Sequence, residues 1–107
     1  MSKYTNAQGQ VAVLISPGFG SGWSSNNWEH QEFLAMDKGL VLLALSKASY
    51  DEVSECCETV IPDGYVSRSA WEEIEVVFLA PGEKFQVHEY DGHESIRILS
   101  KMKFMEA

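Results

Sequence analysis

The dipeptide Asp91-Gly92 constrains the fold of this chain more than any other feature. Asp-Gly is a favoured pair for a two-residue turn between antiparallel strands, and alternating apolar and polar residues flank it here on both sides. With these two residues in the turn, apolar side chains face apolar ones across a β-hairpin of defined register. The predicted pairs are Tyr90 with His93, Glu89 with Glu94, Val87 with Ile96, Gln86 with Arg97, and Phe85 with Ile98.

A second turn signal, Pro81-Gly82, follows a segment in which Ile74, Val76 and Phe78 alternate with other residues. If this turn is equally tight, Phe78 faces Phe85, and the two turns predict an antiparallel three-stranded meander packed on helices. The face toward the helices would carry Ile74, Val76, Phe78, Phe85, Val87, Ile96 and Ile98. Pro-Gly prefers a type II turn, whose twist suits a tight hairpin poorly, so a longer loop is the alternative.

The opposite face of the predicted meander is apolar at one end and rich in functional groups at the other. It would carry Val77, Leu79, Gln86, His88, Tyr90, His93, Ser95, Arg97 and Leu99. Such a surface predicts a covering element, which would be a second subunit, the aromatic loop or a ligand.

The first half of the chain predicts one strand followed by helices. The apolar run Val11 to Ile15 is typical of a buried strand, and residues 29–36 are compatible with a short helix. Asp37 is a plausible N-cap for a helix to about Ala48, and Ser49-x-x-Glu52 has the pattern of a capping box for the next helix, which Pro62-Asp63-Gly64 would end. The predicted class is α+β in a single domain, residues 1–107: one early strand, two or three helices, then the meander.

Composition limits the classes of partner. The chain has 107 residues and a formal net charge of -8, which disfavours nucleic-acid polymers because they require many cationic contacts. No apolar run approaches a membrane span, and the first residues lack an apolar leader. The adjacent Cys56 and Cys57 cannot easily bridge each other and predict reduced thiols. These features favour a cytoplasmic protein.

Residues 16–28, SPGFGSGWSSNNW, form the main candidate binding loop. Backbone N–H groups at Gly20 and Gly22 are candidates to hold an anion, because glycine permits close approach of the backbone to a ligand. The aromatic and polar candidates of this loop, for stacking on a base or bonding to sugar and phosphate, are Phe19, Trp23, Ser24, Ser25, Asn26, Asn27 and Trp28. Neither a GxGxxG pattern nor a P-loop is present. A structural loop whose tryptophans fill the core is the alternative.

The predicted hairpin adds a second group of candidates. Tyr90, Asp91 and Glu94 lie near its tip and are candidate ligand-binding residues. Glu89, Asp91 or Glu94 would accept sugar hydroxyl groups of a ligand, although an exposed polar tip is the simpler explanation. Arg97 is the best candidate for a bidentate phosphate contact, the alternative being an ion pair with a nearby glutamate. His88 and His93 are expected to be surface or hydrogen-bonded histidines. The sequence predicts no catalytic residue, no metal and no cofactor.

Three segments, ISPGFGSGWSSNN, FLAMDKGLV and APGEKFQVHEYDGHESI, resemble a family of small phage-encoded accessory proteins, and the chain is similar to the Thoeris anti-defence sponge proteins. The resemblance spans nearly the full length in the same order. It implies that a homo-oligomer sequesters cyclic ADP-ribose-type immune signals or cyclic oligonucleotides. No individual ligand residue is transferred from that family.

The expected function is therefore non-catalytic binding of a small nucleotide-derived immune signal in the host cytoplasm, without nucleic-acid or membrane partners. One alternative is an acidic inhibitor directed at a host nuclease or defence effector, which the charge of -8 favours. A second alternative is a small hydrolase of the signal that uses Glu89 and Glu94 with His88 or His93.

Overall fold

The early strand, β1 (Val11–Ile15), forms an antiparallel two-stranded sheet with β2 (Glu75–Leu79), in which Val13 lies opposite Val77. The computed structural model describes residues 1–18, 20–61, 65–103 and 105–107. The pairing confirms the strand at 11–15 but shows that the three-stranded meander is wrong, because β2 pairs with β1 and not with the hairpin. β1 is apolar throughout and largely buried, so its backbone groups require a partner strand within the protein.

The hairpin of β3 (Phe85–Tyr90) and β4 (His93–Ile98) has the predicted register, from Tyr90 opposite His93 to Phe85 opposite Ile98. Both turn residues have positive φ, 51° at Asp91 and 82° at Gly92. Two positive φ angles define a type I′ turn, whose twist matches that of the flanking strands. The prediction from Asp91-Gly92 is confirmed.

The Pro81-Gly82 turn separates the two sheets. The amide of Glu83 donates to the carbonyl of Ala80 at 3.1 Å, and Gly82 has a φ of 81°. Pro at the second position and a positive φ at the third are features of a type II turn, which splays the adjoining strands. The chain therefore leaves β2 without folding back beside it.

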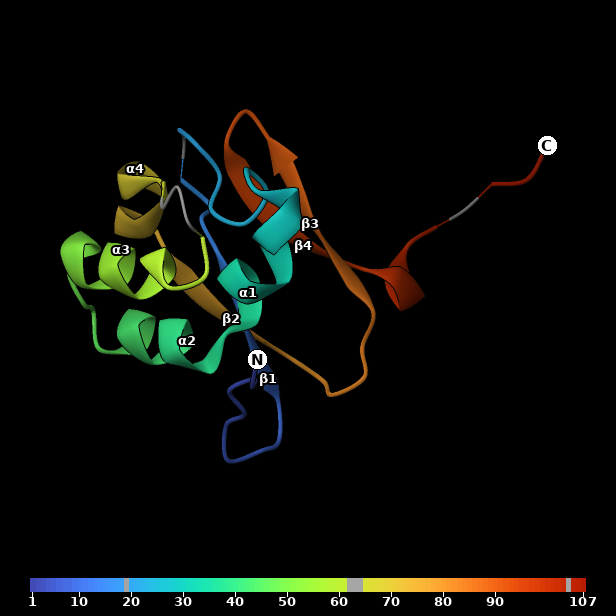
Figure 1. Ribbon diagram of the computed structural model, residues 1–107. Helices are drawn as coiled ribbons and strands as arrows, with labels where there is room; N and C mark the ends of the chain where they lie inside the picture. The colour runs from blue at the N-terminus through green and yellow to red at the C-terminus, as the bar shows by residue number, and fades with distance from the viewer. Residues whose placement is uncertain (19, 62–64, 104) are drawn as a thin grey trace.

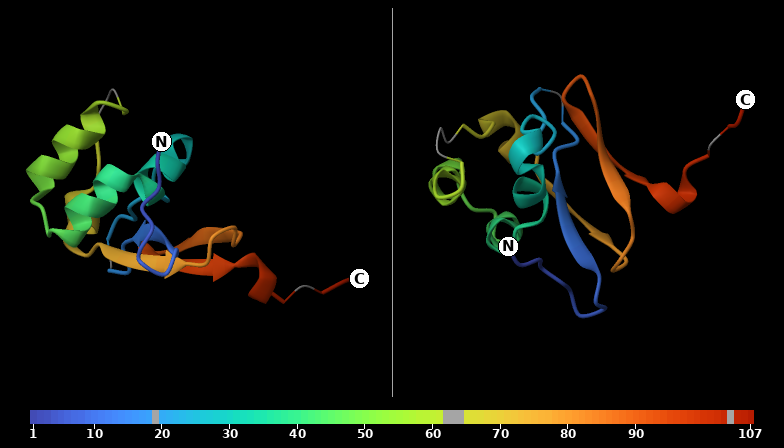
Figure 2. Two further views of the ribbon diagram at one scale, coloured as in Figure 1. Left: turned by 90° about the horizontal axis from the view of Figure 1, so that it is seen from below. Right: turned by 45° about the vertical axis from the view of Figure 1, so that its right-hand side comes forward.

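The β1–β2 sheet lies between helices on one face and the β3–β4 hairpin on the other (Figures 1 and 2). Ala12 and Leu14 point into the helical core, whereas Val13 and Ile15 point toward the hairpin. The single apolar face expected for the meander is thus divided. Ile74, Val76 and Phe78 pack with the helices, and Phe85, Val87, Ile96 and Ile98 pack on the hairpin side. The hairpin itself covers Val77 and Leu79, which explains the apolar end of the opposite face.

The helices follow the predicted caps. The short 3-10 helix η1 (Trp28–His30) leads into α1 (Gln31–Met36), and the Asp37 carboxylate accepts from the Leu40 amide at the start of α2 (Lys38–Leu45). α2 ends before Ala48, since Lys47 has a φ of 57° and leaves the helical region. Ser49 caps α3 (Tyr50–Glu58) through the Glu52 amide. The predicted stop at 62–64 lies outside the described residues.

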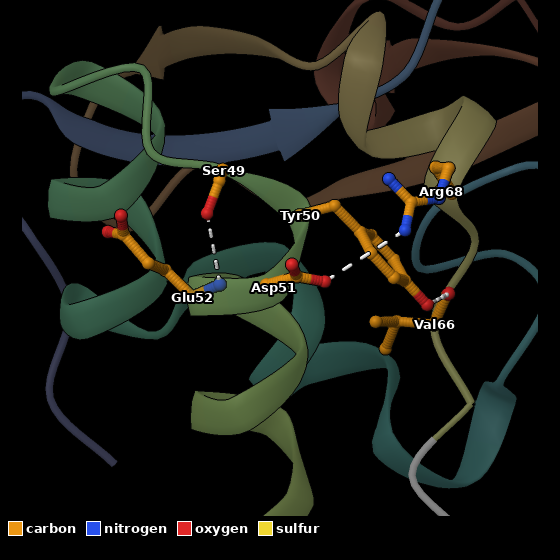
Figure 3. A network of polar contacts seen from close by, with 6 residues as sticks. All are labelled: Ser49, Tyr50, Asp51, Glu52, Val66 and Arg68. Carbon is orange, nitrogen blue, oxygen red and sulfur yellow. Dashed lines mark hydrogen bonds and ion pairs between the residues drawn. The ribbon is translucent and has the colours of Figure 1, made fainter.

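A fourth helix, α4 (Arg68–Glu72), is absent from the sequence-based prediction, although Ser67 caps it through the Ala70 amide. Figure 3 shows how α3 holds the start of α4. The Tyr50 hydroxyl donates to the Val66 carbonyl over 2.7 Å, and the Arg68 guanidinium lies 4.3 Å from the centre of the Tyr50 ring. Arg68 also lies 3.9 Å from the Asp51 carboxylate. A short 3-10 helix, η2 (Leu99–Lys101), follows β4.

Candidate functional site

The glycine-rich loop after β1 closes around a carboxylate of the protein itself. Glu94 is 0% exposed, and its two carboxylate oxygens accept from the amide of Ser16 at 2.9 Å and from the amide of Ser25 at 3.0 Å. The Ser25 hydroxyl adds a bond of 2.6 Å, and the Glu94 amide donates to the Ser16 carbonyl at 2.9 Å. Backbone amides of the loop therefore bind the Glu94 carboxylate, although they are those of Ser16 and Ser25 and not those of the predicted Gly20 and Gly22. The loop and the hairpin meet at this point.

The tip of the hairpin lies directly against the same loop. A side chain at Gly92 would collide with the backbone carbonyl of Gly20, so the close approach requires glycine. Gly22 is similarly surrounded by Ser25 and the Glu94 carboxylate. These glycines serve contacts within the protein. The predicted base-binding residue Phe19 lies outside the described residues.

Trp23 is part of the helical core. Its indole is 2% exposed, its Nε1 donates to the Leu34 carbonyl over 2.7 Å, and its ring lies 5.4 Å from that of Trp71. Trp71 in turn donates from Nε1 to the Ala48 carbonyl at 2.9 Å. The indole N–H groups of Trp23 and Trp71 thus both donate to carbonyls within the protein. Because the Trp23 ring is buried, none of its faces is open for stacking on a ligand.

The remaining polar candidates of the loop make local bonds. The Asn26 amide group donates to the Gly22 carbonyl at 2.8 Å, and the Asn27 side chain accepts from the His30 amide at the start of η1. Ser24 is buried, and its hydroxyl has no hydrogen-bond partner among the described residues. These side chains shape the loop and place Trp28 at its end.

Trp28 is 85% exposed and stands at an open cleft of about 740 Å³ between α1 and β3. We call this the α1–β3 cleft. One wall is a single face of α1, and the other is a run of consecutive residues of β3. Its lining residues are Ser25, Trp28, Gln31, Glu32, Ala35, Met36, Phe85, Gln86, Val87, His88 and Glu89.

The α1–β3 cleft combines an apolar floor with acceptor groups. Glu32 and Glu89 contribute carboxylates, Gln31 and Gln86 contribute amides, and its lining includes neither lysine nor arginine. Glu89 also accepts from the amide of Gly92 in the hairpin turn. Within the described part of the chain, no group of three or more His, Cys, Asp or Glu residues is placed to hold a metal ion. The cleft is suited to binding neutral or cationic groups.

Arg97 lies apart from this cleft. It is exposed on β4 and borders a separate hollow of about 470 Å³ together with Lys101 and Lys103. Tyr90 and Asp91 are exposed at the hairpin tip. Of the predicted binding residues that the structure describes, Trp28 lines the α1–β3 cleft together with Ser25 and Glu89. The sequence did not predict that α1 forms one wall of this cleft, because the pattern of a short helix does not indicate which strand the helix will face.

The two cysteines are free thiols. Burial raises the pKa of Cys57 to about 12, and the charges of Cys56 and Asp37 contribute further. The pKa of Cys56 is also raised, first by burial and then by Asp37. Both thiols stay protonated near neutral pH and are poor nucleophiles.

Comparison of the chain with protein families, with curated proteins and with solved structures finds no match. Among the described residues, no helix is long and apolar enough to span a membrane.

Proposed function

We propose that this protein is a phage-type anti-defence protein that binds a small nucleotide-derived signal in the host cytoplasm and sequesters it unchanged. The observation that carries the proposal is Trp28, whose indole is 85% exposed beside a cleft of about 740 Å³. An exposed indole is a stacking surface for a nucleobase, and clefts of this size suit small ligands. The ligand class follows from the family resemblance of the sequence.

The charges of the cleft favour one orientation of such a ligand. A base stacked on Trp28 would direct its ribose toward Glu32 or Glu89, since carboxylates accept from hydroxyl groups. Phosphate groups would remain on the open, solvent side, because the two carboxylates repel them. Gln31 and Gln86 offer amide groups that both donate and accept. We also propose a homo-oligomeric binding unit, which light scattering tests.

Calorimetric titration with cyclic ADP-ribose, its isomers and cyclic dinucleotides tests the proposal. Trp28→Ala is expected to remove about 1–3 kcal/mol of binding free energy by loss of base stacking. Tyr65→Ala is the matched control, because Tyr65 is also an exposed aromatic residue but does not line the cleft. Mass spectrometry after heat release should recover intact ligand. Absence of binding to every compound, or equal affinity of the Trp28 variant, would contradict the proposal.

A second candidate function is inhibition of a basic protein surface. Asp and Glu outnumber Lys and Arg sixteen to eight, and Arg68 lies 3.9 Å from the Asp51 carboxylate. α3 exposes a group of carboxylates: Asp51, Glu52, Glu55 and Glu58. Affinity that falls steeply with salt, without any small-molecule ligand, would favour this function.

A further inference from the structure

We propose that the free edge of β3 is a docking site for an extended, basic segment of a partner protein, which would add as a third strand to the β3–β4 hairpin. This inference goes beyond small-ligand binding and gives the second candidate function a defined surface. Strand addition is a common mode of peptide recognition, in which main-chain hydrogen bonds provide affinity and alternate side chains provide specificity.

The first observation is the set of β3 residues at the cleft. Five consecutive residues of this strand, from Phe85 to Glu89, line the α1–β3 cleft. Successive side chains of a strand point to opposite faces, so a cleft over one face would be lined by every second residue. A consecutive run means that the cleft follows the edge of β3. In the described part of the chain, β4 is the one strand that pairs with β3.

The register shows which backbone groups this edge presents. Tyr90 and His93 flank a two-residue turn and form a hydrogen-bonded pair, after which bonded and non-bonded pairs alternate. The bond from the Leu99 amide to the Lys84 carbonyl, 2.9 Å, continues the same alternation. The N–H and C=O groups of Phe85, Val87 and Glu89 therefore point away from β4. These groups form a row of donors and acceptors that an added strand would satisfy.

The opposite wall limits what can be added. Ala35 and Met36 of α1 and Val87 of β3 give the cleft an apolar floor. Six residues of β3 extend over about 20 Å, which is the length of a six-residue extended peptide. Alternate apolar side chains of such a peptide would contact the floor, while the others would point outward.

Charge selects a basic occupant. Glu32 and Glu89 lie on the two walls, the lining includes neither lysine nor arginine, and the whole chain carries a net charge of -8. A segment that alternates lysine or arginine with β-branched residues complements these walls and has a high strand propensity. An acidic segment does not match the charge of the cleft. A helical segment cannot pair with the exposed backbone groups of β3.

The test uses the full chain and the peptide acetyl-(Lys-Val)₃-amide as the probe. We expect binding, whereas the (Glu-Val)₃ peptide should not bind. Two further versions carry N-methyl groups on the three valine or the three lysine amides. Because alternate amides of a strand point to opposite edges, one version should lose more than about tenfold in affinity and the other should not. Equal effects of both, or no binding of the basic peptide, would overturn the proposal.

Amide hydrogen exchange locates the peptide on the protein. On binding, protection should increase at Phe85, Val87 and Glu89, with little change at Gln86 and His88, whose amides already face β4. Glu32→Lys should weaken peptide binding by about fivefold or more, from the reversed charge in the cleft. Glu72→Lys makes the same change on α4, outside the lining of the cleft, and should keep affinity within about twofold.

Protection without this alternation, or equal effects of the two charge reversals, would contradict docking at the β3 edge. Self-association of the protein through the same three amides would also contradict it, since a second copy would then be the occupant. No nucleotide is present in these measurements, so their outcome is independent of whether the cleft binds a small ligand.

Discussion

At the scale of the single residue, the carboxylate of Glu94 joins the two halves of the molecule. It accepts hydrogen bonds from the backbone of Ser16 and Ser25, which belong to the loop after β1, while its own residue lies on β4. A buried carboxylate is stable only when its lone pairs are satisfied by donors, and here three bonds do so.

Glu94→Ala should therefore lower the free energy of unfolding by about 3 kcal/mol or more, because the buried amide of Ser16 and the partly buried amide of Ser25 lose a charged acceptor. Glu94→Gln should cost less, since its side-chain oxygen still accepts one bond. Glu72→Ala, at an exposed glutamate of α4, should change stability by no more than about 0.5 kcal/mol. Urea denaturation measures all three. A loss below about 1 kcal/mol for Glu94→Ala would show that the loop holds its shape without this residue.

The buried thiol of Cys57 predicts that the stability of the fold depends on pH. Because burial raises its pKa to about 12, the folded state holds the thiol proton more tightly than the unfolded chain, whose thiol titrates near about 8.5. The stabilisation that comes from the raised pKa of Cys57 is complete below about pH 8.5 and is lost as the pH rises toward 12. The free energy of unfolding then falls by at most about 1.4 kcal/mol per pH unit.

Cys57→Ala should remove this part of the alkaline slope while leaving the other titrating groups in place. Denaturation curves at about pH 8 and about pH 10.5 measure the difference between the two proteins. Parallel loss of stability in both proteins would show that the thiol does not control the slope.

At the scale of the element, the β3–β4 hairpin is positioned by its turn as well as by its apolar face. Phe85, Val87, Ile96 and Ile98 bury one face against the β1–β2 sheet, and the tip rests on Gly20. Both contacts hold the hairpin on the β1–β2 sheet (Figure 2), and the α1–β3 cleft borders β3.

Gly92→Ala tests this contact, with Gly9→Ala as a matched control. Both glycines have similar positive φ angles, 82° and 78°, but a side chain at Gly9 meets open space, whereas one at Gly92 meets the Gly20 carbonyl. We expect a loss of about 1 kcal/mol at Gly9 and at least twice that at Gly92. Thermal denaturation compares them, and equal losses would mean that the tip contact contributes nothing.

At the scale of the whole molecule, charge is distributed unequally. Carboxylates are exposed over α3, while Arg97, Lys101 and Lys103 gather at the end of the hairpin. With a net charge of -8, repulsion opposes the compact state, and screening should reduce it.

Raising the salt concentration from about 0.01 M to about 0.15 M shortens the screening length from about 30 Å to about 8 Å. We expect the melting temperature to rise by a few degrees, because the repulsion between carboxylates is long-ranged and acidic residues outnumber basic ones sixteen to eight. Calorimetric melting at both concentrations measures the effect. A fall in melting temperature would instead indicate that attractive pairs dominate.

The local elements of this protein follow from its sequence. Asp91-Gly92 determined the register of β3 and β4, Asp37 and Ser49 determined where α2 and α3 begin, and the run at 11–15 determined β1. Each depends on interactions between residues close in the chain, whose preferences are expressed locally. The type II preference of Pro81-Gly82 was equally readable, and it is the reason that β2 does not join the hairpin.

The tertiary structure alone decided which surfaces meet. The pairing of β2 with β1, the burial of Trp23 against Trp71 and the capture of Glu94 by the loop join residues far apart in the chain. Alternating apolar residues indicate that one face of a strand is buried, but they do not indicate which element covers it. A glycine-rich loop indicates that it can hold a carboxylate, but it does not indicate which residue supplies that carboxylate. For the same reason the α1–β3 cleft, with one wall from each half of the chain, has no signature in the sequence.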